Sequence, residues 1–113
     1  MPPRTGLGEL ELVVLLALVR LGDGAYGAVI RDEIKARTGR AVTPGAIYPT
    51  LDRLETKGLV RSFMGDPQPV RGGRARRHFA LKPAGRAEAR RAWRQLATLA
   101  AGLDPAFEPG RSR

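Results

Sequence analysis

The stretch TPGAIYPTLDRLETKGLV, residues 43–60, has the apolar spacing of an amphipathic helix but carries a proline inside it. Its apolar residues recur at i, i+4 and i+7 and are expected to face the core: Ile47, Leu51 and Leu54. Thr43 is suited to the N-cap and Pro44 to the first helical position, and Gly58 closes the helix. Pro49 removes a backbone donor and crowds the carbonyl four residues back, at a cost of roughly 3 kcal/mol or more.

The position of Pro49 makes this cost tolerable. It lies near the helix N-terminus, close to the turns whose amide groups lack intrahelical partners. The crowded carbonyl belongs to Gly45, and glycine has the freedom to yield. We therefore expect a slight bend that presents Tyr48, Pro49 and Thr50 at the tip of the helix.

Two further helices are expected before this one. Residues 9–21 are hydrophobic nearly all round, which is typical of a central, buried helix. Residues 26–38 place apolar side chains on one helical face: Tyr26, Val29, Ile30 and Ile34. Because only a short turn separates residues 26–38 from the helix at 43–58, the pair has a helix-turn-helix pattern.

A basic hairpin and a fourth helix follow. Residues 59–66 and 74–81 read as strands joined by a loop rich in proline and glycine. Three helices followed by a basic hairpin make a winged helix. A last helix begins at Pro83, and its apolar residues step by three and four, as in a coiled-coil seam: Ala89, Ala92, Leu96, Leu99 and Leu103.

The predicted fold is mainly α with a small β-hairpin, a winged helix-turn-helix with a C-terminal dimerisation helix. We expect a DNA-binding domain at residues 1–82, the dimerisation helix at 83–103 and a flexible tail at 104–113. The length of 113 residues suits one compact domain.

The charge is concentrated in the second half of the chain. Residues 1–60 contain eight basic and seven acidic side chains, whereas residues 61–113 contain twelve and four, within a net charge of +9. This asymmetry suggests a polyanionic partner, either nucleic acid or a membrane surface. The alternative is a solvated basic face, and charge alone does not decide between the two.

Composition excludes several kinds of site. The chain has no cysteine and a single histidine, His78, so disulfides, thiolate catalysis and a multi-histidine metal site are excluded. No nucleophile–base pair or phosphate-binding loop is evident, and we expect neither an enzyme nor a bound cofactor or metal. The longest apolar run, Leu12 to Val19, is far too short to span a bilayer. We expect a cytoplasmic protein that does not bind membranes.

Four stretches, in the same order along the chain, resemble the PadR family of transcriptional regulators, in its short form with one C-terminal helix. They are GELELVVLLALV (8–19), AYGAVIRDEI (25–34), GAIYPTLDRLETKGLV (45–60) and GGRARRHFAL (72–81). The resemblance implies a dimeric DNA-binding regulator, usually a repressor. Three positions depart from the family's usual residues: Ala28, the pair His78-Phe79, and Lys82, which leaves the last helix without a side-chain N-cap.

The first turns of the reading helix in a helix-turn-helix protein meet base edges. The predicted base-reading residues are Thr43, Tyr48, Pro49 and Thr50. Hydroxyl groups would bond base edges, and Pro49 and the threonine methyl would contact a thymine methyl. In the alternative interpretation, Tyr48 packs on the hairpin and Pro49 merely ends an irregular turn.

Basic residues and two glycines are predicted to hold the phosphate backbone or enter the minor groove. They are Arg53, Lys57, Arg71, Gly72, Gly73, Arg74, Arg76 and Arg77. The alternative is a solvated wing that does not touch DNA.

The predicted dimer contacts come from the first and last helices: Leu12, Leu16, Ala89, Ala92, Trp93, Leu96, Leu99 and Leu103. The seam of the last helix can pack either on its own N-terminal helix or on a partner's copy. Trp93 is the only tryptophan, and some members of the family bind flat aromatic effectors between their last helices. Trp93 is therefore a candidate for an effector pocket that takes a small aromatic compound, or else an ordinary packing residue.

Together these features predict a homodimeric repressor that binds double-stranded DNA. It would read a pseudo-palindromic operator with the helix at 43–58 and hold it with a basic wing at 66–77. The alternative is a winged-helix module that binds RNA or protein without operator specificity.

Overall fold

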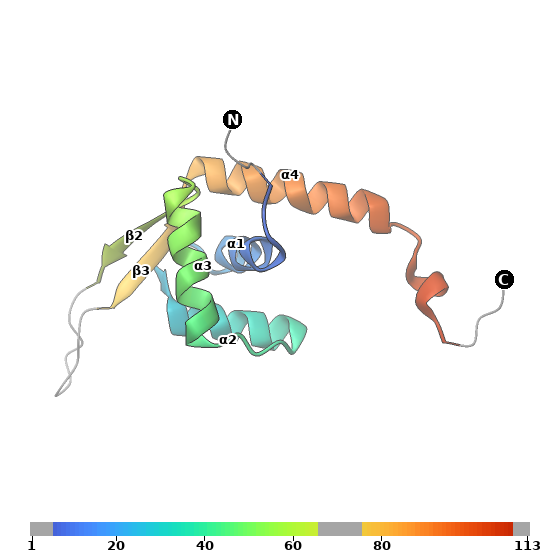
Figure 1. Cartoon of the computed structure of the whole chain (residues 1–113), viewed down its shortest axis with the longest axis horizontal. Coiled ribbons are helices and arrows are strands. Elements are labelled where there is room, and N and C mark those ends of the chain that lie inside the picture. Colours follow the sequence, from blue (N-terminus) through green and yellow to red (C-terminus); the bar gives the residue numbers. More distant parts are fainter. Residues whose placement is uncertain (1–5, 66–75, 110–113) are drawn as a thin grey trace.

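The computed structural model describes residues 6–65 and 76–109. Four α-helices and a small antiparallel sheet make up this part of the chain (Figure 1). The elements, in order, are α1 (Glu9–Leu21), β1 (Ala25–Tyr26), α2 (Gly27–Thr38), α3 (Pro44–Thr56), β2 (Val60–Met64), β3 (Arg77–Leu81), α4 (Pro83–Ala100) and the 3-10 turn η1 (Asp104–Phe107). The predicted fold class, a mainly α winged helix with a C-terminal helix, is confirmed.

Helix α1 lies at the centre of the molecule, as its apolar composition predicts. It packs against α2, α3, α4 and β3. The residues predicted to face the core from α3 are all fully buried: Ile47, Leu51 and Leu54. On the turn between α2 and α3, the Arg31 Nε donates a hydrogen bond to the Val42 carbonyl oxygen at 2.6 Å. The helix-turn-helix is thus held both by the core and by this polar contact.

The sheet has a third strand that the sequence analysis did not predict. The strand order is β1-β3-β2, and Ala25 pairs with Phe79 while Tyr26 pairs with His78. Tyr26 was predicted to belong to the second helix, and this is wrong: it has an extended backbone and is the N-cap of α2. Pairing with β3 stabilises the extended conformation at these two residues.

Helix α4 has two halves with different environments. Its first turns pack on the body of the protein, where Ala89 is buried. Its second half extends beyond α1, and η1 lies past its far end (Figure 1). The predicted tail therefore contains one turn of 3-10 helix, whose side chains are exposed. Lys82, the N-cap of α4, makes no side-chain cap hydrogen bond, as the sequence indicates.

Gly85 allows α4 to approach the start of β2. A Cβ atom at this position would collide with the carbonyl oxygen of Leu59. That carbonyl also accepts a hydrogen bond from the Lys82 N–H at 3.0 Å. Because the neighbour is backbone, it cannot rotate away as a side chain would. The direction in which α4 leaves the body is therefore set at this contact.

Gly85→Ala is expected to destabilise the protein by about 1–3 kcal/mol, because the added methyl must displace backbone. Urea denaturation followed by circular dichroism would measure the change. Gly45→Ala is the matched control: it is also a helical glycine, and its Cβ would meet nothing closer than the Thr43 hydroxyl at 3.8 Å. There alanine should be neutral or stabilising by up to about 1 kcal/mol. Equal effects at both positions would contradict this account.

Candidate nucleic-acid interface

Helix α3 begins as the sequence predicts and continues through its proline. The Thr43 Oγ1 accepts a hydrogen bond from the Ala46 N–H at 3.2 Å, and Pro44 is the first helical residue. Pro49 lies inside the helix and is exposed. The exposed side of this first part of α3 therefore presents Thr43, Tyr48 and Pro49.

Thr50 does not belong to that surface, so its prediction as a base-reading residue is wrong. Its side chain is completely buried. The hydroxyl donates a hydrogen bond to the Ala46 carbonyl oxygen at 2.8 Å and accepts one from the Arg53 Nη2 at 3.1 Å. Periodicity explains the error, since residue 50 lies one turn after Ile47 and between the core residues of this helix.

Tyr48 is 41% exposed and packs over the first residue of α2. A Cβ atom on Gly27 would collide with its phenol oxygen and ring edge, so only glycine leaves room for this position of the ring. This geometry differs from the alternative interpretation, in which Tyr48 packs on the hairpin. In the structure the Tyr48 ring contacts α2, and part of the side chain stays accessible.

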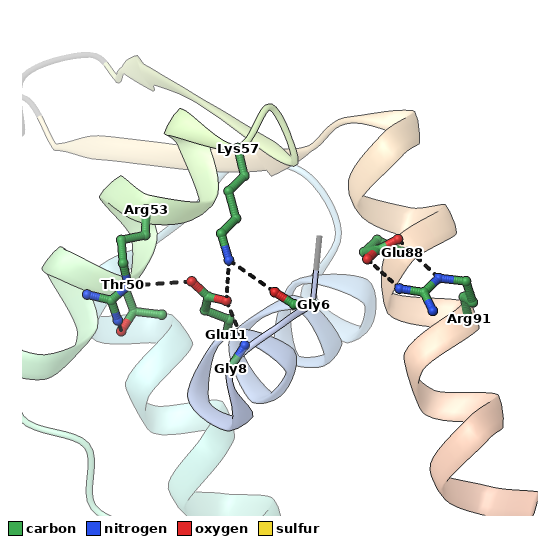
Figure 2. Close-up of polar contacts among 8 residues, drawn as sticks. All are labelled: Gly6, Gly8, Glu11, Thr50, Arg53, Lys57, Glu88 and Arg91. Atoms are coloured by element: carbon green, nitrogen blue, oxygen red, sulfur yellow. Dashed lines mark hydrogen bonds and ion pairs between the residues drawn. The ribbon is translucent and has the colours of Figure 1, made fainter. Parts of the chain in front are cut away.

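A buried carboxylate connects α1 to the C-terminal half of α3 (Figure 2). Glu11 is 5% exposed, and its Oε1 accepts hydrogen bonds from the Lys57 Nζ and the Gly8 N–H, both at 2.7 Å. Its other oxygen, Oε2, forms an ion pair with the Arg53 Nε at 3.4 Å. The Gly8 contact is also part of the N-terminal capping of α1. One carboxylate thus ties together the start of α1 and two basic side chains at the C-terminal end of α3.

These contacts determine the protonation of Glu11. Burial by itself would raise the pKa of this carboxyl, but it is outweighed by the hydrogen bonds from Lys57 and Gly8 and by the nearby positive charges. The net result is a pKa below the ordinary value. Glu11 is therefore ionised at neutral pH and offsets part of the charge of Arg53 and Lys57, the two residues predicted to hold phosphates.

A second ionic cluster joins α3 to the base of the wing. Arg77 donates from Nη2 to the Glu55 Oε1 at 2.6 Å and from Nη1 to the Asp52 Oδ1 at 3.0 Å. Ser62 on β2 also donates to Glu55, through its hydroxyl at 2.8 Å. The Ser62 hydroxyl contributes most to lowering the pKa of Glu55, burial opposes it, and Arg77 adds to it. Arg77 is therefore engaged within the protein, in contrast to its predicted role in phosphate binding.

Aromatic and arginine side chains form a ladder across the three strands. The His78 ring stacks on Phe63 of β2 and meets Tyr26 of β1 edge-on, each with centroids 5.5 Å apart. Arg76 lies over the Tyr26 ring at 4.4 Å and Arg61 over the Phe63 ring at 5.0 Å. Both arginines are exposed. The wing base thus carries two exposed guanidinium groups at defined places, of which only Arg76 was predicted.

The remaining predicted wing residues lie outside the described residues: Arg71, Gly72, Gly73 and Arg74. Four positions of the site were missed by sequence reasoning: Glu11, Gly27, Tyr26 and Arg61. Glu11 had a usable signal, since it is a charged residue in a helix that is otherwise apolar nearly all round. Tyr26 follows from the pairing of β1 with β3, which leaves no periodic pattern in two residues. Gly27 and Arg61 matter through tertiary contacts with Tyr48 and Phe63, which local spacing does not predict.

The predicted dimer contacts divide into covered and uncovered residues. Leu12 and Ala89 are buried in the core of their own chain, so the prediction that they face a partner is wrong. Leu16 and Ala92 are half-buried. The remaining four are exposed: Trp93 at 52%, Leu96 at 51%, Leu99 at 78% and Leu103 at 39%. Two shallow hollows along α4 are lined by neighbours of Trp93, such as Ala92 and Arg94, rather than by Trp93 itself.

Comparison with known proteins finds transcriptional regulators, both by family model and by sequence identity. The sequence model of the transcriptional regulator PadR-like family matches residues 15–91. Over 75 residues the chain is 48% identical to transcriptional regulator Rv3488 of Mycobacterium tuberculosis, covering 64% of this chain and 65% of that protein. The chain thus spans slightly less than two thirds of this relative.

Solved structures share the fold. A PadR family transcription regulator from Clostridium difficile R20291 matches with a TM-score of 0.73 at 19% identity, covering 89% of this chain and 100% of that one. F93 from STIV, a winged-helix DNA-binding protein, matches with a TM-score of 0.68 at 19% identity, covering 87% and 98%. Within residues 6–65 and 76–109, no helix is both long enough and apolar enough to cross a bilayer.

Glu11→Gln is expected to lower the free energy of unfolding at pH 7 by about 1–3 kcal/mol, because hydrogen bonds to a charged group are lost. The folded-state pKa of Glu11 is lowered, so its contribution is present above the ordinary pKa of 4.5 and disappears as the pH falls through the folded value. Urea titrations at pH 7 and about pH 3 should therefore show the gap between variant and wild type shrinking in acid.

Glu9→Gln is the matched control on the same helix. Glu9 pairs with Arg40 at the surface and is largely exposed, so its removal should cost less than about 1 kcal/mol. A gap for Glu11→Gln that is the same at both pH values would show that the carboxylate is not the stabilising group.

Proposed function

Since the chain belongs to the PadR-like family of transcriptional regulators, we propose that it is a homodimeric repressor that reads a pseudo-palindromic operator with α3. The family consists of regulators, not enzymes, and the winged helix is its DNA-binding fold. The observation that carries the proposal is the exposed reading end of α3, held in place by two ionic clusters. Both clusters act on side chains of α3 that lie beyond its first turns, and they leave Tyr48 and Pro49 accessible.

The reading surface combines Tyr48, Pro49 and the exposed Thr43 at the N-terminal end of α3. That end carries the positive pole of the helix dipole, which favours approach to a phosphate backbone. Arg61 and Arg76, exposed on the sheet over the rings of Phe63 and Tyr26, supply further positive charge. Tyr48 offers a hydroxyl to base edges and Pro49 an apolar contact. The Tyr48 ring is positioned by its packing over Gly27, and the ring of Pro49 is rigid by its own covalent structure.

The proposed dimer forms through the second half of α4. Leu96 and Leu99 continue the heptad-like seam beyond the point where the body of the protein covers it. The helix ends at Ala100 and not at residue 103 as predicted, so the exposed Leu103 follows the helix rather than belonging to it. A row of exposed large apolar side chains on one helix is typical of a protein–protein interface. Two copies related by a two-fold axis would bury these residues against each other and would join two reading helices.

We also propose that a planar aromatic effector binds beside the seam. Half of the Trp93 side chain is accessible beside the seam, so a flat ligand between two subunits could stack on the indole. Such a ligand would release the operator only if it binds one dimer conformation more tightly than another, and if the two conformations differ in the distance between the two α3 helices. Because Trp93 is the sole tryptophan, its emission would report this binding directly.

DNase footprinting on the DNA upstream of the protein's own gene is expected to show two protected half-sites related by dyad symmetry. Two reading helices of one dimer should contact half-sites roughly 34 Å apart, one helical turn of DNA. Competition with random duplex and with single-stranded RNA supplies the control. A footprint without dyad symmetry, or tighter binding to the RNA, would favour an RNA- or protein-interaction module instead.

Tyr48→Ala is expected to cost about 1–3 kcal/mol of discrimination between operator and random DNA, because a base contact is lost. Gly27→Ala should have a similar effect, since its methyl displaces the Tyr48 ring without changing any residue at the DNA surface. Fluorescence anisotropy with both DNAs at several salt concentrations would measure the ratio.

The double variant provides the internal control for this pair. Once Tyr48 is alanine, Gly27→Ala has no ring to displace, so the two effects should not add. Additive losses, or an unchanged specificity ratio for Tyr48→Ala, would exclude Tyr48 as a base-reading residue.

A further inference from the structure

An apolar hollow of about 170 Å³ lies between α1 and α2, on a part of the protein that the reading surface does not use. Its floor is made of aliphatic side chains from both helices: Val13, Leu16, Ala17 and Ile34. A cavity of about 150 Å³ lined by such side chains accepts benzene, so this hollow is large enough for one phenyl ring.

The rim of the hollow is basic. Arg20 from α1 and Arg37 from α2 both line it, together with a single carboxylate, Glu33. Glu33 forms an ion pair with Arg37 at 2.9 Å, which leaves an excess of one positive charge at the rim. The chemistry that fits is therefore an aromatic or aliphatic side chain flanked by carboxylates.

The segment around η1 has this chemistry. Phe107 is 75% exposed although it belongs to a formed 3-10 turn. Asp104 and Glu108 flank it, and together with Glu88 they are the only acidic residues after position 82. The segment also follows directly on the apolar seam, since Leu103 immediately precedes η1.

The segment cannot reach the hollow of its own subunit while α4 is straight. Figure 1 shows η1 beyond the far end of α4, whereas the hollow lies on the body between α1 and α2. In a two-fold dimer whose α4 seams pack antiparallel, each α4 leads its tail toward the body of the other subunit. The occupant that these directions favour is a second copy of this chain.

We propose that Phe107 of one subunit inserts into the α1–α2 hollow of its partner, with Asp104 and Glu108 placed against the arginine rim. This inference rests on the proposed homodimer and specifies a contact within it. The contact would fix each tail to the first helix of the other subunit's helix-turn-helix. The dimer would then be held at two places, the seam and the hollow.

Sedimentation of Phe107→Ala tests the anchor. Removing a buried phenylalanine should raise the dimer dissociation constant at least about ten-fold. Phe63→Ala is the matched control, because Phe63 is an exposed phenylalanine on β2 at the wing base and should leave dimerisation unchanged. Arg20→Glu should weaken the dimer in the same direction, whereas Lys35→Glu, on α2 but outside the hollow, should not.

Cross-linking tests the location. The chain has no cysteine, so cysteines introduced in pairs react only with each other. Ala106→Cys combined with Thr38→Cys, at the rim of the hollow, should give a covalent dimer with a short bismaleimide in dilute protein. Ala106→Cys combined with Thr56→Cys, at the end of α3, should not. Adding Phe107→Ala should abolish the rim cross-link.

The outcomes separate this inference from the proposed function. A monomer in sedimentation of the wild type would overturn both. A dimer that binds its operator but shows neither the Phe107→Ala effect nor the rim cross-link would overturn only the insertion of Phe107. A rim cross-link that persists with Phe107→Ala would also overturn it, because the tail would then lie there without the proposed anchor.

Discussion

The carboxylate of Glu11 is surrounded by the N–H of Gly8, the ammonium of Lys57 and the guanidinium of Arg53. A buried charge must be matched in this way, because leaving it unpaired costs several kcal/mol. The buried side chains of α3 interdigitate with those of α1, and the ionic contact adds a directional constraint to this packing. The placement of the first part of α3 depends on both.

The same helix is fixed from its other side by the wing. Arg77 reaches from β3 to Asp52 and Glu55, and Ser62 adds a contact from β2. The basic residues Arg53 and Lys57 thus pair with Glu11 of α1, while Asp52 and Glu55 of α3 pair with Arg77 of the sheet. Three basic side chains that the sequence assigned to DNA therefore form ion pairs within the protein. The positive charges of Arg61 and Arg76 are different, since these exposed side chains stack on the rings of Phe63 and Tyr26 and form none of the ion pairs described above.

Sequence patterns predicted the features of the fold that depend on local periodicity. The helices, the two main strands, the core residues of α3 and the missing side-chain cap at Lys82 all follow from spacing and capping rules. The sequence patterns failed where a tertiary contact determines the position or the partner of a residue. Thr50 was assigned to the surface because its hydroxyl suits DNA, but its place on the helix buries it. The two residues of β1 have no period to detect, and the two basic partners of Glu11, Arg53 and Lys57, are more than 40 positions away along the chain. The DNA contacts themselves stay predictions.

The close contact between Gly85 and the Leu59 carbonyl gives α4 the character of a lever arm. Its 18 residues form a rod of about 27 Å, attached to the body through its first half, where Ala89 is buried and Ala92 packs against the core. A rotation of about 10° at that attachment would move the far end of such a rod by roughly 5 Å. In a dimer joined through the far ends, this displacement would change the separation of the two reading helices. The stiffness of this attachment, to which the Gly85–Leu59 backbone contact contributes, would then affect how well the protein matches one spacing of half-sites against another.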